Sequence, residues 1–208
     1  TLREFGREAV AHGWSLAVHA IGDAAVAFGA RWLASLPAPG GPHRLEHVQH
    51  VDPVTLRRLA ESDIIPSIQP LHRLEDQGML LARVGPDRAG WAFPARSLWR
   101  VNRPPALGSD WPVVEADPLK TIHAALQPRG EGEGMPGEEL SVTQALEAAS
   151  SGAASAAGFR GTGRLQPGEA ADLVWLQVDP GDSVQAWRET RVGAVWRGGE
   201  LVHQAVDF

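Results

Sequence analysis

The spacing of apolar residues divides the first three quarters of the chain into helices and short strands that alternate. Apolar residues recur at helical spacing in segments 2–13, 23–36, 52–62 and 117–126. Short apolar runs typical of buried strands lie between or beside them, at Ser15–His19, His43–Val48, Asp63–Gln69 and Pro105–Leu107. This alternation predicts parallel strands that are joined by right-handed crossovers.

Capping residues mark where several of these helices begin. Thr1 with Glu4 and Ser141 with Gln144 have the spacing of capping boxes, and the second opens an Ala-rich helix that runs towards Gly158. The pairs Asp52–Pro53 and Asp117–Pro118 place an N-cap aspartate before a proline at the first helical position. The pattern therefore predicts helices directly after the strands.

Two stretches interrupt the alternation. Leu71–Arg103 is long for a connection and contains helical pieces around Gly78–Leu81 and Ala95–Trp99, which is typical of an insertion that acts as a lid. Segment 128–137 is rich in Gly and Glu and is predicted to be a mobile loop.

The pattern changes after Gly161. Ala171–Leu176 reads as a strand, and Val192–Val202 as a hairpin around Gly198–Gly199, a dipeptide suited to a type I′ turn. We therefore divide the chain into an α/β part, residues 1–158, and a β segment, residues 159–208. A doubly wound sheet and a (β/α)₈ barrel both fit the first part. A barrel needs eight units over about 250 residues, so the pattern alone indicates half of one.

Composition limits the possible functions. The 208 residues include 19 Lys and Arg against 25 Asp and Glu, a net charge of −6 without a run of like charges, which argues against nucleic-acid and membrane partners. Because the chain has no cysteine, any metal must be held by His, Asp or Glu, which suits Zn, and also Fe or Mn. With no signal peptide and no apolar stretch near the roughly 20 residues of a membrane span, we expect a cytoplasmic protein.

Three candidate metal ligands lie at the ends of predicted strands: His19, His47 and Asp110. In a barrel the carboxyl ends of the strands meet at one mouth, so these side chains would converge there. A divalent metal lowers the pKa of bound water to about 7 and supplies hydroxide, and Asp110 could also accept the proton. Spacing alone leaves structural roles open, namely satisfied histidines at strand ends and a turn-capping Asp110.

Five short motifs follow one another along the chain, at His19–Asp23, Arg44–Gln49, Ser67–His72, Leu107–Val113 and Gly163–Val174. In this order they resemble motifs of the amidohydrolase superfamily, and most closely its amidohydrolase 3 branch, which includes exoenzyme-regulator-like and N-substituted formamide deformylase-like proteins. The resemblance covers nearly the whole chain. It implies the C-terminal half of a metal-dependent (β/α)₈ TIM barrel, followed by strands of a small β-sandwich.

The resemblance also implies a chemistry and a ligand set. It implies hydrolysis of a non-peptide carbon–nitrogen bond in a small amide-like substrate, with His19, His47 and Asp110 supplied by the fifth, sixth and eighth barrel strands. The family's first strand supplies a His-x-His pair, and a carboxylate or carboxylated lysine comes near its fourth strand. This sequence has neither, and Ala24 stands where an arginine is common.

Further candidates surround these ligands. His72, which matches a family histidine, is predicted to contact substrate or polarise its carbonyl, with a surface helix histidine as the alternative. Gln69 and Trp111 are predicted to contact substrate, the first from the same strand end and the second as a pocket wall. His50 and His123 are predicted to be structural.

Three interpretations remain open. The first is the C-terminal portion of a hydrolase acting on carbon–nitrogen bonds, inactive as this chain alone. The second is a non-catalytic fragment, or a subunit whose partner supplies the absent strands, and self-association is left open. The third is a metallo-phosphoesterase, for which Arg73 is the obvious phosphate-binding candidate.

Overall fold

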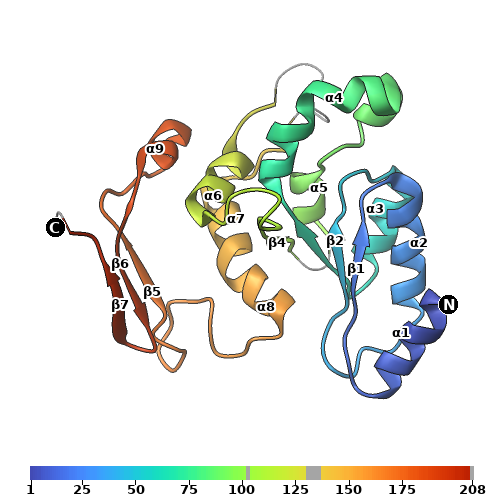
Figure 1. Cartoon of the computed structure of the whole chain (residues 1–208), viewed down its shortest axis with the longest axis horizontal. Helices are drawn as coiled ribbons and strands as arrows, with labels where there is room; N and C mark the ends of the chain where they lie inside the picture. Colours follow the sequence, from blue (N-terminus) through green and yellow to red (C-terminus); the bar gives the residue numbers. More distant parts are fainter. Residues whose placement is uncertain (102–103, 130–136, 207–208) are drawn as a thin grey trace.

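A parallel sheet organises the first part of the chain (Figure 1). The computed structural model describes residues 1–101, 104–129 and 137–206, and within them one sheet has four strands in the order β1-β2-β3-β4, every pair parallel. The strands are β1 (Ala17–Ala20), β2 (Arg44–His47), β3 (Ile65–Ile68) and β4 (Ala106–Leu107). The predicted α/β class is therefore confirmed, and each strand lies within or beside its predicted segment.

Helices join these strands and cover the sheet. They are α1 (Leu2–Ala11), α2 (Asp23–Ala34), α3 (Pro53–Ala60), α4 (Pro70–Ala89), α5 (Ala95–Trp99), α6 (Pro118–Leu126), α7 (Val142–Glu147), the π-helical turn η1 (Ala148–Gly152) and α8 (Ala153–Ala157). Both predicted capping boxes are formed, and Asp52 and Asp117 each accept hydrogen bonds from two backbone amides of the following turn. The residues that start the helices were therefore readable from the sequence.

The predicted insertion is more regular than its sequence indicates. Residues 70–89 form α4, which is kinked where Gly85 has a φ of 74° and Pro86 follows. Proline removes a backbone donor and clashes with the preceding turn, which accounts for the kink. Most of the predicted loop at 128–137 lies outside the described residues, because these exclude 130–136.

A second, antiparallel sheet follows. In the described residues after Gly137 it contains β5 (Leu173–Leu176), β6 (Val192–Arg197) and β7 (Glu200–Gln204). Gly198 and Gly199 have φ values of 58° and 83°, which confirms the predicted hairpin turn. Helix α9 (Val184–Glu189) was not predicted, although Ser183 accepts a hydrogen bond from the Ala186 amide as an N-cap. The boundary after residue 158 stays a prediction.

The main core lies between the parallel sheet and its helices. Leu33 of α2, Leu45 of β2, Leu59 of α3 and Leu98 of α5 are at most 1% exposed. In contrast, Ala17 and His19 of the edge strand β1 are exposed. Searching the described residues gives no helix with the length and apolar character that a membrane span requires.

A glycine at η1 allows the helix to approach β4 closely. A Cβ on Gly152 would lie 2.8 Å from the carbonyl oxygen of Pro105, which cannot move without shifting the strand. We expect Gly152→Ala to lower the free energy of unfolding by about 1–3 kcal/mol. Gly78→Ala is the matched control, because a Cβ there meets nothing within 4 Å on α4 and should stabilise the helix by up to about 1 kcal/mol. Urea unfolding measures the change in free energy of both variants, provided that the dependence on urea concentration (the m-value) stays the same. Equal urea midpoints for the two variants would contradict the close contact at Gly152.

The buried imidazole of His43 ties β2 to two neighbouring segments. His43 is 3% exposed; its Nδ1 accepts from the Leu16 amide at 3.0 Å, and its Nε2 donates to the Pro37 carbonyl at 3.1 Å. Burial lowers the pKa of His43, against the opposing effect of the Pro37 hydrogen bond. A proton on Nδ1 would also face the Leu16 N–H, so the fold needs the neutral ring.

Acid should therefore weaken the fold through His43. Because the folded-state pKa lies below the unfolded value of about 6.5, this stability is complete above pH 6.5 and is lost as pH falls towards the folded pKa. Urea unfolding in a metal chelator between pH 7.5 and 5 should show this loss in wild type and a smaller one in His43→Asn. His203→Asn, on exposed β7, is the control, and its free energy of unfolding should depend on pH as that of the wild type does. A His43→Asn variant that loses as much stability between pH 7.5 and 5 as the wild type would contradict this role of His43.

Candidate metal centre

A strained turn places His47 at the mouth of the parallel sheet. His47 ends β2 with a φ of 73°, and Val48 follows with a φ of 47°, a rare conformation for a β-branched residue. The Val48 amide donates to the Glu46 carbonyl at 3.1 Å, which forms a γ-turn, and also to Ala20 of β1 at 3.0 Å. Strained non-glycine residues concentrate at functional sites, so this turn points to a role for His47.

The start of α4 places His72 beside His47. Gln69 directly follows β3 and is the N-cap of α4, with Pro70 at the first helical position, so His72 lies in the first turn, just beyond the strand end. Its ring stacks on that of His47 with centroids 5.7 Å apart. Both residues are buried, at 8% and 9% exposed.

Asp110 comes from the loop after β4. The strand ends at Leu107, as the apolar run predicts, so Asp110 lies three residues into the loop and not at the strand end, and it has a φ of 63°. Its side chain is 42% exposed, and its Oδ2 lies 3.8 Å from Nε2 of His72. Asp110 is therefore the member of the group that is open to solvent.

These residues form the candidate metal group of the described residues. His47, His72 and Asp110 each offer a ligand atom, and the atoms lie within 4.8 Å of one another. Ligand atoms on a tetrahedral zinc lie about 3.3 Å apart, because each is about 2.0–2.1 Å from the ion. A shift of about 1 Å or less per side chain, within rotamer adjustment, would bring the atoms to that spacing.

His19, the first predicted ligand, lies next to this group but is not part of it. Its ring meets the His47 ring edge-on, with centroids 4.4 Å apart. The structure thus brings His19, His47 and Asp110 to one end of the sheet. It also brings in His72, for which the sequence predicted a substrate contact.

The donor atoms are suited to a cation. His47 Nδ1 and His72 Nε2 are buried and have no hydrogen-bond partner among the described residues. Buried polar atoms are normally satisfied, so unsatisfied nitrogens beside a carboxylate fit a metal. Burial lowers the pKa of His47, and the neighbouring His19 lowers it further against the opposing effect of Asp110. The neutral imidazole that a metal requires is therefore favoured.

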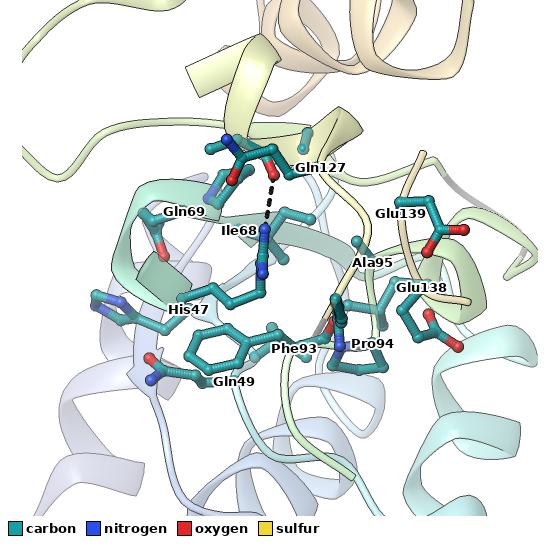
Figure 2. Close-up of a pocket in the computed structure, with 17 residues that line it drawn as sticks. His47, Gln49, Ile68, Gln69, Phe93, Pro94, Ala95, Gln127, Glu138 and Glu139 are labelled. Carbon is teal, nitrogen blue, oxygen red and sulfur yellow. Dashed lines mark hydrogen bonds between the residues drawn. The ribbon is translucent and has the colours of Figure 1, made fainter. Parts of the chain in front are cut away.

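A small cavity adjoins His47 (Figure 2). It measures about 30 Å³, enough for a water molecule or two, and lies between residues from the ends of β2 and β3 and residues around α5. Gln69 is 8% exposed and lines it, as does Arg73, which is 4% exposed and donates to the Ala124 carbonyl at 3.3 Å. Trp111 is 70% exposed and does not line this cavity.

The far wall of the cavity contains residues that the sequence did not reveal. Glu138 is 5% exposed; its carboxylate accepts from the Ser97 amide at 2.7 Å and the Ser97 hydroxyl at 2.6 Å, which ties residues after the predicted loop to α5. Phe93, with a φ of 50°, donates its amide to the Gln49 carbonyl at 2.7 Å. No sequence motif marks either residue. Glu138 is marked by its burial and Phe93 by its positive φ, and only the fold shows either.

Comparisons with known proteins match this description. The model of the amidohydrolase family matches residues 1–203. The chain is 34% identical to Protein LONG AFTER FAR-RED 3 of Arabidopsis thaliana over 97% of its length, and 31% identical to the putative amidohydrolase YtcJ of Bacillus subtilis over 86%. It covers 36% and 35% of those proteins, so it spans about a third of the length of the curated relatives it matches.

Solved structures agree on the fold. An uncharacterized metal-dependent hydrolase from Pyrococcus furiosus is 30% identical with a TM-score of 0.70, over 79% of this chain and 33% of that one. A mutant of the atrazine chlorohydrolase TrzN from Arthrobacter aurescens, complexed with zinc and atraton, is 18% identical with a TM-score of 0.63, over 97% and 47%. The parallel sheet is thus part of a TIM barrel of the amidohydrolase kind. With the family model matched over 1–203, this chain belongs to the amidohydrolase family.

Proposed function

We propose that this chain supplies one side of the active site of a metal-dependent hydrolase that cleaves non-peptide carbon–nitrogen bonds in small amide-like molecules. The observation that carries the proposal is the convergence of His47, His72 and Asp110 at the carboxyl ends of three adjacent parallel strands. In barrel enzymes this end of the sheet holds the active site. Family membership supports the hydrolase class.

A divalent metal, with zinc as the first choice, is part of this proposal. Imidazole and carboxylate donors suit zinc and also accommodate iron or manganese. The metal-dependent Pyrococcus relative and the zinc complex of TrzN support the same class of ion. We propose His19, His47 and Asp110 as ligands: His47 and Asp110 belong to the group described above together with His72, and the His19 ring lies next to the His47 ring.

Each residue of the site then has a chemical task. A bound metal would act as a Lewis acid and make water a nucleophile near neutral pH. Asp110 would accept a proton and deliver it to the leaving amine, and its partial exposure lets a substrate reach it. His72 would donate to the carbonyl oxygen of the substrate, and Gln69 would hydrogen-bond the substrate from the end of β3. Trp111 would cover the bound substrate from the surface.

A specific observation favours a second candidate, a chain that is not catalytic by itself. Ala17 and His19 of β1 are exposed, although they belong to a strand of a parallel sheet, and such sheets are normally covered. This exposure fits a chain that works together with further barrel strands. The phosphoesterase alternative is less favoured, since Arg73 lies in the cavity with its guanidinium hydrogen-bonded to Ala124.

Metal affinity tests the ligand set. We expect the metal-free chain to bind zinc with a Kd weaker than about 1 μM, because the ligand atoms of its candidate group lie up to 4.8 Å apart and must move together before they can share an ion. His47→Ala should weaken binding by at least about tenfold. His203→Ala, on exposed β7, should leave it unchanged. Competition with a fluorescent chelator measures these values, and tight stoichiometric zinc that survives His47→Ala would contradict the assignment.

Amine release tests the activity. The chain alone should hydrolyse N-acyl amides poorly even with zinc, whereas the longest protein that its reading frame encodes should be active. In that protein Asp110→Asn should lower kcat by about 10²–10⁴-fold, because it removes the proton acceptor while keeping the side-chain shape. Asp87→Asn, an exposed aspartate on α4, is the control. Cleavage of phosphate esters without amide hydrolysis, or full activity of Asp110→Asn, would overturn the proposal.

A further inference from the structure

A groove separate from the candidate metal centre lies between α4, α6 and α9. Its volume is about 640 Å³, within the range of about 300–1,000 Å³ in which proteins bind small molecules. Helix α9 packs against α6, so the groove joins the two parts of the chain (Figure 1). Neither His47, His72 nor Asp110 lines it. The function proposed above therefore does not account for it.

One side of the groove is apolar. Leu71 and Leu74 of α4 and Leu119 of α6 line it while only partly buried, so part of each side chain faces open space. Trp187 of α9 is 3% exposed, and its indole Nε1 donates to the Gly181 carbonyl at 3.0 Å, which holds the ring in place. The partly exposed leucines are a surface on which an apolar ligand body can rest, beside the fixed ring of Trp187.

The other side is basic. Lys120 and His123 come from α6, and Arg188 and Arg191 come from α9 and the residues just after it. Hydrogen bonding to Glu115 raises the pKa of Lys120, and the positive charge of Arg191 acts against that shift. Burial lowers the pKa of His123, and Arg188 lowers it further. Basic groups from α6, from α9 and from the residues just after α9 thus line one groove.

The acidic residues near the groove are already engaged. Asp117 accepts hydrogen bonds from the amides of Leu119 and Lys120 at 2.9 and 3.2 Å, and thereby caps α6. Glu115 pairs with Lys120, at the rim. Two of the basic groups are held in place as well, since Lys120 pairs with Glu115 and Arg191 Nη1 donates to the Glu189 and Thr190 carbonyls at 2.9 Å. The groove thus presents fixed positive charge in a chain whose net charge is −6.

We propose that this groove binds a small phosphate ester with an apolar body. Guanidinium groups pair with phosphate oxygens through two parallel hydrogen bonds, and an ammonium adds a point charge. The leucines would contact the body of the ligand. A dianionic phosphate matches the several positive charges better than a singly charged carboxylate does. Occupancy would also hold α9 against α6, because each helix supplies part of the site.

Titration with phenyl phosphate tests the proposal. The complete 208-residue chain, kept in a metal chelator so that phosphate cannot bind a metal, is followed by ¹H–¹⁵N NMR. We expect the Trp187 indole and Leu119 amide signals to shift with a common Kd, while the His47 and His72 amides stay in place. The double variant Lys120→Gln/Arg188→Gln should raise that Kd by about tenfold or more.

Control titrations separate the contribution of charge to binding from that of apolar contact. Arg83→Gln, which removes an exposed positive charge from α4 outside the groove, should keep the wild-type Kd. Inorganic phosphate should bind several-fold more weakly than phenyl phosphate, and benzyl alcohol more weakly still. The proposal is wrong if the double variant binds as wild type does, if inorganic phosphate binds equally well, or if the shifts centre on the metal group instead of Trp187.

Discussion

The hydrogen bond from the Val48 amide to the Ala20 carbonyl is the contact on which the site depends. It continues the parallel pairing of β1 and β2 one residue past the end of β2, at 3.0 Å, while the backbone already turns through positive φ at His47. The turn would relax without that contact, because left-handed conformations cost non-glycine residues of the order of 1–3 kcal/mol. Sheet register therefore sets the direction of the His47 ring.

The residues beyond this turn are held in the same way. The His50 amide donates to the Ile21 carbonyl at 3.0 Å, and the Val51 amide to the Trp91 carbonyl at 3.1 Å. The loop after β2 is thus hydrogen-bonded both to the loop after β1 and to Trp91, just beyond α4. These contacts are backbone hydrogen bonds, which form with many different side chains. The sequence therefore gives little indication of how the loops at this end of the sheet are arranged.

Helix starts and side-chain directions at the mouth differ in how far the sequence predicts them, for a physical reason. Helix starts were readable because a cap is local: Asp52 and Ser141 bond amides two or three residues away. Side-chain direction at the mouth was not readable. The pattern placed Asp110 at the end of its strand, whereas β4 ends at Leu107 and a loop carries Asp110 back towards His72. That return depends on positive φ at an aspartate, which propensity does not predict.

The unsatisfied nitrogens of His47 and His72 have an energetic meaning. A buried polar atom without a partner costs about 1–3 kcal/mol, so a ligand that bonds to these nitrogens would stabilise the fold. His43, also buried, shows the ordinary solution, since both of its nitrogens are hydrogen-bonded. His47 differs from His43 in having a nitrogen left to bind a ligand, and it differs from the other histidines with such a nitrogen in its place beside Asp110 and His72. A cation at His47 would bind this free nitrogen, so binding of the ion and folding of the residues around it are thermodynamically coupled.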